Sequence, residues 1–228
     1  MSGTPSTKNL RAMPDPETLW KRCVSLALAE MAVGSEHPHY RLDASWQKGA
    51  LFTRDNGAGD GYAMAFVKGG VLIRGFDHTS PMSPYQSDDG NTLWPGMYDA
   101  LPKSMRELVD DPRVAPDPIG VTFCIAHGYA LAKWLVGVKK FPADYDEMPG
   151  DGSRWLLGSV VLGAREYVDW AVDYYGRPVP YEPIATLFAH GVLQDAALAK
   201  INPKADIAAI RSLAAAARYG KSGLPPFA

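Results

Sequence analysis

The chain has 228 residues, 46% of them hydrophobic, and a formal net charge of −2, so it is long enough to bury a sizeable core. Its charge balance excludes a strongly basic protein that would bind nucleic acid through overall charge. The sequence shows no apolar stretch of a secretory signal and no run of roughly 18 apolar residues that could span a membrane. We therefore expect a cytoplasmic protein that contacts neither nucleic acid nor membrane.

The two cysteines both lie in apolar contexts, Cys23 in a helical pattern and Cys124 in a strand-like run. A reduced, buried pair is the expected state, because cytoplasmic proteins rarely keep disulfides. A disulfide between the two stays open from the sequence alone.

The N-terminal part predicts a tail followed by a long helix. Residues 1–13 are small and polar and are predicted to be a disordered tail. Asp15 is the expected N-cap of a helix with Pro16 in its first turn, and Gly34 ends the helix. Residues 14–220 are predicted to form a single α+β domain, and residues 221–228 a flexible C-terminal tail.

The stretch 45–77 predicts a meander of three antiparallel strands. Apolar runs at 50–53, 62–67 and 71–73 are separated by glycine-rich turns, the first of which spans residues 55–61. Residues 121–126 and 131–136 predict a further hairpin around His127 and Gly128, although a helix through residues 129–138 competes with this interpretation.

Helical patterns dominate the second half of the chain. Residues 101–109 predict a short helix, followed by a connector rich in proline over 110–118. The clearest apolar stripe, over residues 153–175, predicts one continuous helix. Shorter helices are expected at 181–190 and 193–201, and a last helix starts at Asn202 and Pro203 and runs to Tyr219. Strands before helices indicate an α+β fold, with an antiparallel sheet of about five strands.

The segment 74–99 is too rich in rings and charges to be a plain connector. It contains Phe76, Tyr85, Trp94 and Tyr98, and three prolines restrict its freedom. Residues 87–118 hold seven acidic residues against three basic ones, and a second acidic run lies at 144–151, whereas 196–228 is mainly basic. Expected contacts with a basic partner are therefore the four rings together with Asp88, Asp89 and Asp111.

Asp77 and His78 are the best candidates for chemistry, because they stand where a strand gives way to a loop. With a further carboxylate such as Asp99, they could act as acid and base or hold a divalent metal. The structural alternative is that Asp77 caps the turn while His78 forms a hydrogen bond across the loop. No metal site is predicted with enough support to name its ligands, and no cofactor is expected.

Other short motifs lack the context that their chemistry needs. The glycines of 57–61 lie between strands, whereas a dinucleotide-binding loop lies between a strand and a helix. A strand is expected at 121–126, and on it Cys124 and the nearby His127 would face opposite sides, so they cannot form a nucleophile pair. His37 and His39 lack further ligands at metal-binding spacing.

The segment Gly75-Phe-Asp-His-Thr-Ser-Pro-Met-Ser-Pro-Tyr85, followed by Trp94-Pro-Gly96, resembles uncharacterised bacterial proteins that share a GFDH-x-SP-x-SPY segment. The strand 121–124 extends the resemblance, which covers about a third of the chain. The resemblance implies a bacterial origin and does not imply any activity.

Three functions are compatible with these observations. The first is a non-enzymatic cytoplasmic binding protein, in its concrete form a bacterial immunity protein that neutralises a basic toxin. The second is a metal-assisted hydrolase that uses Asp77, His78 and Asp99. The third is a structural oligomer subunit in which the helix 153–175 packs against a copy of itself.

Overall fold

The computed structural model describes residues 3–34, 36–143, 150–161, 163–190 and 193–221. Within these residues, six strands form one antiparallel sheet in which neighbours in sequence are neighbours in space. The strands are β1 (Tyr40–Asp43), β2 (Gly49–Asp55), β3 (Gly61–Val67), β4 (Gly70–Phe76), β5 (Phe123–Gly128) and β6 (Lys133–Leu135). Most helices follow the sheet in sequence, so the α+β prediction is confirmed. The sheet gains β1, a short strand that the sequence did not predict.

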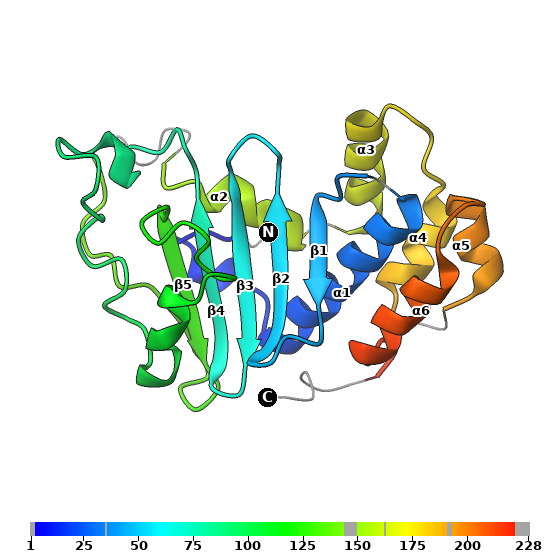
Figure 1. Ribbon diagram of the computed structural model, residues 1–228, viewed down its shortest axis with the longest axis horizontal. Coiled ribbons are helices and arrows are strands. Elements are labelled where there is room, and N and C mark those ends of the chain that lie inside the picture. Colours follow the sequence, from blue (N-terminus) through cyan, green and yellow to red (C-terminus); the bar gives the residue numbers. More distant parts are fainter. Residues whose placement is uncertain (1–2, 35, 144–149, 162, 191–192, 222–228) are drawn as a thin grey trace.

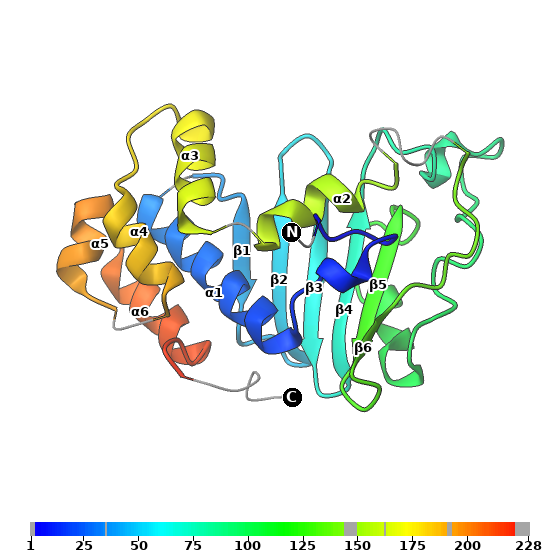
Figure 2. The same cartoon turned by 180° about the vertical axis from the view of Figure 1, so that it is seen from behind.

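Helices cover one face of the sheet and extend beyond its β1 edge (Figures 1 and 2). The α-helices are α1 (Pro16–Val33), α2 (Ser153–Leu156), α3 (Ala164–Tyr175), α4 (Tyr181–Phe188), α5 (Asp195–Ile201) and α6 (Ile207–Ala216). The 3-10 helices are η1 (Leu10–Ala12), η2 (Pro84–Gln86), η3 (Lys103–Asp110) and η4 (Leu157–Val161). No helix in the described residues is long and apolar enough to cross a membrane.

The central helix is α1, and its predicted ends are confirmed. The Asp15 carboxylate accepts the backbone N–H of Thr18 at 3.0 Å, and Gly34 closes the helix with a positive φ of 73°. The helix is buried along most of its length because it packs against β1 on one side and α4, α5 and α6 on the other.

The sheet has a core on each face because successive strand residues alternate between faces. The core on the helix side includes Phe52, Met64 and Cys23, and the core on the other side includes Leu72 and Cys124. Both cysteines are free and buried, as predicted. They belong to different cores, on opposite faces of the sheet.

The connection between β4 and β5, residues 77–122, forms the layer over the second face. Its apolar residues are buried against the sheet; they are Met82, Met97, Leu101, Met105, Leu108 and Val114. Fully burying a side chain of this size contributes about 1.5–3 kcal/mol. This segment is therefore part of the packed fold, even though most of it is irregular.

The N-terminal segment is buried at residues 5–7 and remains in contact with the fold up to the start of α1, which corrects the expectation of a disordered tail for this part of it. Thr7 is buried, and its hydroxyl donates to the carboxylate of Asp151, while its backbone N–H donates to Ser153 Oγ at 3.1 Å. Trp134 Nε1 donates to the carbonyl of Pro14 at 3.0 Å. The segment crosses the helix side of the sheet beside α2 (Figure 2). The predicted C-terminal tail lies outside the described residues except for Lys221.

The continuous helix predicted over residues 153–175 is wrong. The described part consists of α2, η4 and α3, and Gly163 adopts an extended backbone before α3 begins. The helix on which the oligomer interpretation rested is thus divided into pieces that pack on different neighbours. The carboxylate of Glu166 accepts the N–H of Gly163 at 2.9 Å and caps the new start.

Two smaller predictions also differ from the structure. The helix predicted over 101–109 is the 3-10 helix η3. The last helix begins after Asp206, whose carboxylate accepts the N–H of Ala209 at 2.9 Å, whereas Asn202 donates to the carbonyl of Val33. The hairpin of β5 and β6 is confirmed, but its turn lies at residues 129–132 and not around His127 and Gly128, which are the last residues of β5.

Candidate functional site

Asp77 follows the last residue of β4 and is almost fully buried, with an exposed fraction of 1%. Its Oδ1 accepts the backbone N–H and the hydroxyl of Thr79, each at 2.8 Å. Its Oδ2 accepts Trp155 Nε1 from α2, also at 2.8 Å. Asp77 therefore closes a turn on one side and fastens α2 to the end of the sheet on the other.

The space around Asp77 is shaped by Gly152. This glycine has a positive φ of 81°, and a Cβ atom at its position would lie 2.4 Å from Cβ of Asp77. Thr122 connects the same two segments, because its hydroxyl accepts the N–H of Asp77 at 3.1 Å and donates to the carbonyl of Asp151 at 2.8 Å. The turn at Asp77 and the start of α2 are consequently one packed unit.

His78 pairs with Asp60, a residue of the turn between β2 and β3. Asp60 Oδ1 accepts the backbone N–H of His78 at 2.8 Å and lies 2.7 Å from its Nδ1. The hydrogen bond to Asp60 and its negative charge raise the pKa of His78 above its ordinary value. Burial raises the pKa of Asp60, but hydrogen bonds from His78 and Asn56 outweigh it and hold the value below the usual range.

Asp60, Asp77 and His78 each offer one potential ligand atom, and these atoms lie within 4.8 Å of one another. Two carboxylates and an imidazole suit zinc or another first-row divalent metal. A metal bound through His78 Nδ1 would have to replace the hydrogen bond of that nitrogen to Asp60. Asp99, the carboxylate expected from the sequence, is not in this group and is exposed elsewhere on the long segment.

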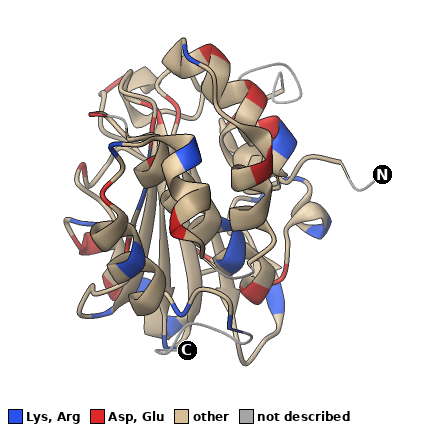
Figure 3. Cartoon of the chain, turned by 90° about the vertical axis from the view of Figure 1, so that its right-hand side faces the viewer, with Lys and Arg blue, Asp and Glu red and all other residues tan. Residues whose placement is uncertain are grey.

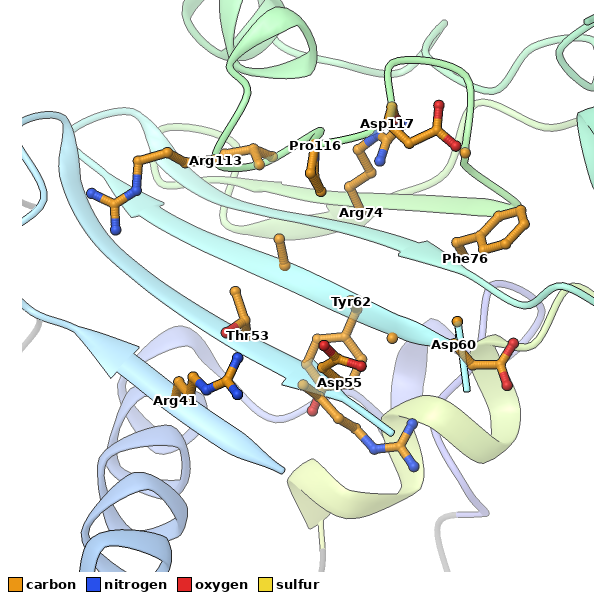
Figure 4. Close-up of a pocket in the computed structure, with 16 residues that line it drawn as sticks. Arg41, Thr53, Asp55, Asp60, Tyr62, Arg74, Phe76, Arg113, Pro116 and Asp117 are labelled. Carbon is orange, nitrogen blue, oxygen red and sulfur yellow. Dashed lines mark hydrogen bonds between the residues drawn. The ribbon is translucent and has the colours of Figure 1, made fainter. Parts of the chain in front are cut away.

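A hollow of about 370 Å³ opens beside this cluster on the second face of the sheet. Its floor is formed by β2 and β3, with Arg41 of β1 on one side and the segment 113–117 on the other (Figure 4). Asp60 and Phe76 lie together at one end of it (Figure 4). The hollow is therefore open to solvent, carries charged side chains around a partly apolar lining, and borders the Asp60 and His78 pair.

Of the four rings expected at a binding surface, one is largely outward. The exposed fraction of Tyr85 is 49%. Phe76 is half-buried and meets the ring of Tyr85 edge to face, with 5.8 Å between centroids. Trp94 and Tyr98 are half-buried against the core of the second face, so they serve mainly in packing.

The acidic residues expected at the binding surface also include both exposed and buried side chains. Asp88 and Asp89 are exposed on the long segment. Asp111 is buried, and its carboxylate pairs with Lys48 Nζ at 2.8 Å, so it is unsuitable as an exposed contact. Asp144, Asp146 and Glu147 lie outside the described residues, and Asp151 at the end of that run is buried.

The basic excess of residues 196–228 does not produce a basic face at the helical end. On the side of the molecule that carries α3 to α6, segments of both charge signs are interspersed (Figure 3). Asp195 pairs with Arg211 at 2.6 Å, which neutralises one of those cations locally.

Sequence patterns do not indicate Asp60 or the arginines of the hollow as site residues. Asp60 lies in a glycine-rich turn that was interpreted only as a hairpin, and its link to His78 spans 18 residues. Arg41 belongs to the strand that was not predicted. Strand register brings these residues together, and no local motif marks it.

Comparison of the chain with protein-family models, with curated proteins and with solved structures gave no match.

Proposed function

We propose that this chain is a non-enzymatic protein-binding protein whose recognition surface consists of Tyr85, Asp88 and Asp89. Its partner is a protein with a basic face. The observation that carries the proposal is an outward ring next to exposed carboxylates on a segment that is otherwise packed onto the sheet. An aromatic anchor beside complementary charge is a common composition of protein interfaces.

Tyr85 is supported in its outward position by two neighbours. Its hydroxyl donates to the carboxylate of Asp117, and Phe76 packs against its ring. The hydrogen bond to Asp117 raises the pKa of Tyr85, so the phenol keeps its proton at neutral pH. A ring held in this way loses little side-chain entropy on binding, which favours affinity.

The acidic part of the recognition surface is also ordered before binding. The carboxylate of Asp89 accepts the hydroxyls of Ser87 and Thr92 and the backbone N–H groups of Asn91 and Thr92. Hydrogen bonds from Asn91, Thr92 and Ser87 lower the pKa of Asp89 to about 2. The loop thus presents a fixed negative charge, and its neighbour Asp88 makes no hydrogen bond within the described residues.

A bacterial immunity protein that neutralises a basic toxin, such as a nuclease, is the concrete form of this proposal. Such a protein needs shape and charge complementarity and no catalytic group, which agrees with carboxylates that already have protein partners. A toxin gene is then expected beside the gene for this chain. Expression of the chain should rescue growth in the presence of that toxin.

The test is capture of the partner from the organism that encodes the chain, followed by titration with purified proteins. Asp88→Lys should weaken binding about tenfold and flatten its dependence on salt, because one steering charge is reversed. Asp173→Lys on α3 is the matched control, since Asp173 is also exposed, makes no hydrogen bond or ion pair to any described residue, and lies away from the recognition surface. Equal losses in both variants, or none in either, would contradict this recognition surface.

A metal-assisted hydrolase is a second candidate, favoured by the closeness of Asp60, Asp77 and His78. A divalent metal held there would activate water for attack on a substrate in the neighbouring hollow. The test is metal analysis of the purified chain. Stoichiometric zinc that is lost in His78→Ala and kept in His37→Ala would support this candidate, and equal metal content in all three proteins would oppose it.

A further inference from the structure

The hollow is built on one row of residues that crosses the sheet. Arg41, Thr53, Ala63 and Arg74 are paired in register across β1, β2, β3 and β4. Residues paired in this way point to the same face of a sheet. The short side chains of Thr53 and Ala63 lie between the two arginines, so the floor is recessed and a cation stands on each side.

Arg74 is a buried cation without a carboxylate partner in the described part of the chain. Its exposed fraction is 5%. Nε donates to the hydroxyl of Tyr98 at 3.1 Å, and Nη2 donates to the carbonyls of Asp117 at 2.7 Å and Pro118 at 3.1 Å. All three acceptors are neutral, and Nη1 makes no hydrogen bond to any described residue. Buried charges are normally paired, so this site lacks an anion.

The opposite side of the hollow has unused donors as well. Arg41 is exposed and forms neither an ion pair nor a hydrogen bond within the described residues. The hydroxyl of Thr53 likewise has no partner there. Arg54 also borders the hollow through β2, but it alternates with Thr53, so its side chain points to the other face of the sheet and lies over the ring of Trp155. The arginines of the hollow therefore have more hydrogen-bond donors than the protein satisfies.

The acidic residues of the lining do not fill this need. Asp117 accepts the hydroxyl of Tyr85, Asp60 accepts His78, and Asp55 accepts the N–H of Gly57 at 2.8 Å. Arg113, at the rim, is already paired with Asp43 at 2.6 Å. Among the described residues on this face of the sheet, Arg41 and Arg74 are the lining cations that keep free hydrogen-bond donors, whereas a carboxylate oxygen of each lining aspartate already accepts a hydrogen bond.

We propose that the hollow binds a small organic anion through a carboxylate or phosphate group held between Arg41, Thr53 and Arg74. Its volume of about 370 Å³ lies in the range of small-ligand sites, roughly 300–1,000 Å³. Guanidinium groups match both kinds of oxyanion with paired N–H donors. The site goes beyond the proposed protein-binding function, because it uses none of the residues of the recognition surface.

The experiment is isothermal titration of the full chain with citrate and, separately, with inorganic phosphate, at an ionic strength kept constant with sodium chloride. We expect saturable binding of at least one of them with a Kd of about 1 mM or tighter. The difference between the two titrations tells whether the site prefers carboxylate or phosphate.

Two variants locate the binding in the hollow. Arg41→Gln should weaken it roughly tenfold or more, whereas Arg106→Gln on η3 removes an equally exposed charge elsewhere and should leave it unchanged. Thr53→Ile keeps the β-branched shape, fills the floor and should also abolish binding without changing the charge. Circular dichroism checks that each variant is folded. Failure of both anions to saturate, or equal weakening by Arg41→Gln and Arg106→Gln, would overturn the proposal.

Discussion

Asp60 and His78 connect two turns at the same end of the sheet through a single carboxylate oxygen, 2.7 Å from the ring nitrogen and 2.8 Å from the backbone nitrogen of His78. The His78 side chain is 54% exposed, so the ion pair itself contributes little to stability. The main effect of the pair is to fix the position of the segment that follows β4. The first residues of the long segment are held beside the hollow, and the recognition surface follows a few residues later.

Asp77 should be a stabilising residue. Asp77→Ala leaves Trp155 Nε1 and the Thr79 groups without their acceptor, so we expect the free energy of unfolding to fall by about 2–4 kcal/mol. Urea unfolding of the variant measures this loss. His78→Ala, next in sequence but with an exposed ring, should lower the free energy of unfolding much less.

A double-mutant cycle separates the contact of Asp77 with α2 from its role in the turn. Trp155→Phe removes the indole N–H together with part of the ring, and the loss of packing cancels in the cycle because the double variant shares it. The coupling with Asp77→Ala should be about 1–2 kcal/mol. A coupling near zero would show that the hydrogen bond contributes nothing and that Asp77 acts through the turn alone.

Gly152 should tolerate a side chain far less well than Gly176. Both have a positive φ, 81° and 61°, but a Cβ atom at Gly152 would meet Asp77, whereas the space around Gly176 is open. We expect Gly176→Ala to cost about 1 kcal/mol and Gly152→Ala at least about 2 kcal/mol, measured by thermal or urea unfolding. Equal costs would contradict the packing described around Asp77.

His39 should make the fold sensitive to acid. Its ring is 3% exposed, stands among Tyr40, Trp170 and Tyr174, and has no hydrogen bond at either nitrogen within the described residues. Burial, helped by the positive charge of Arg54, lowers its pKa to about 4. The unfolded chain therefore binds a proton more readily than the folded one.

The sign of the pH dependence follows from that difference. Neutral His39 contributes fully to the free energy of unfolding above about pH 6.5. As the pH drops, this contribution falls, and about 3 kcal/mol of it is lost near pH 4. Burial raises the pKa of Glu30, which acts in the opposite direction. The measurement is therefore the free energy of unfolding of the wild type and of His39→Phe from pH 7 to pH 4. It should fall less steeply with decreasing pH in the variant.

Elements defined by local signals were predictable from the sequence. The ends of α1 follow from Asp15, Pro16 and Gly34, and each of these residues acts on its immediate neighbours in sequence. The strands of the meander follow from apolar runs between glycine turns. The helix over 153–175 was not predictable in its true form, because Gly163 interrupts it where the two parts pack onto different layers.

The candidate site depended on contacts between distant residues. Asp77 and His78 were found because they end a strand, but their third member is Asp60 rather than Asp99, and the choice is made by the pairing of β3 with β4. The sequence predicts Asp111 as an exposed contact residue, but in the fold it pairs with Lys48, which is distant in sequence. The hollow arises from a row of four strands, which single-sequence patterns do not specify.

The central claim is that an outward tyrosine anchors a basic partner. Tyr85 and Tyr174 are a matched pair, with exposed fractions of 49% and 47%, but Tyr174 lies on α3, away from the recognition surface. The decisive measurement is titration of the captured partner with Tyr85→Ala and Tyr174→Ala. The account predicts a loss of affinity of roughly tenfold to a hundredfold for Tyr85→Ala and none for Tyr174→Ala. Unchanged affinity in Tyr85→Ala would contradict it.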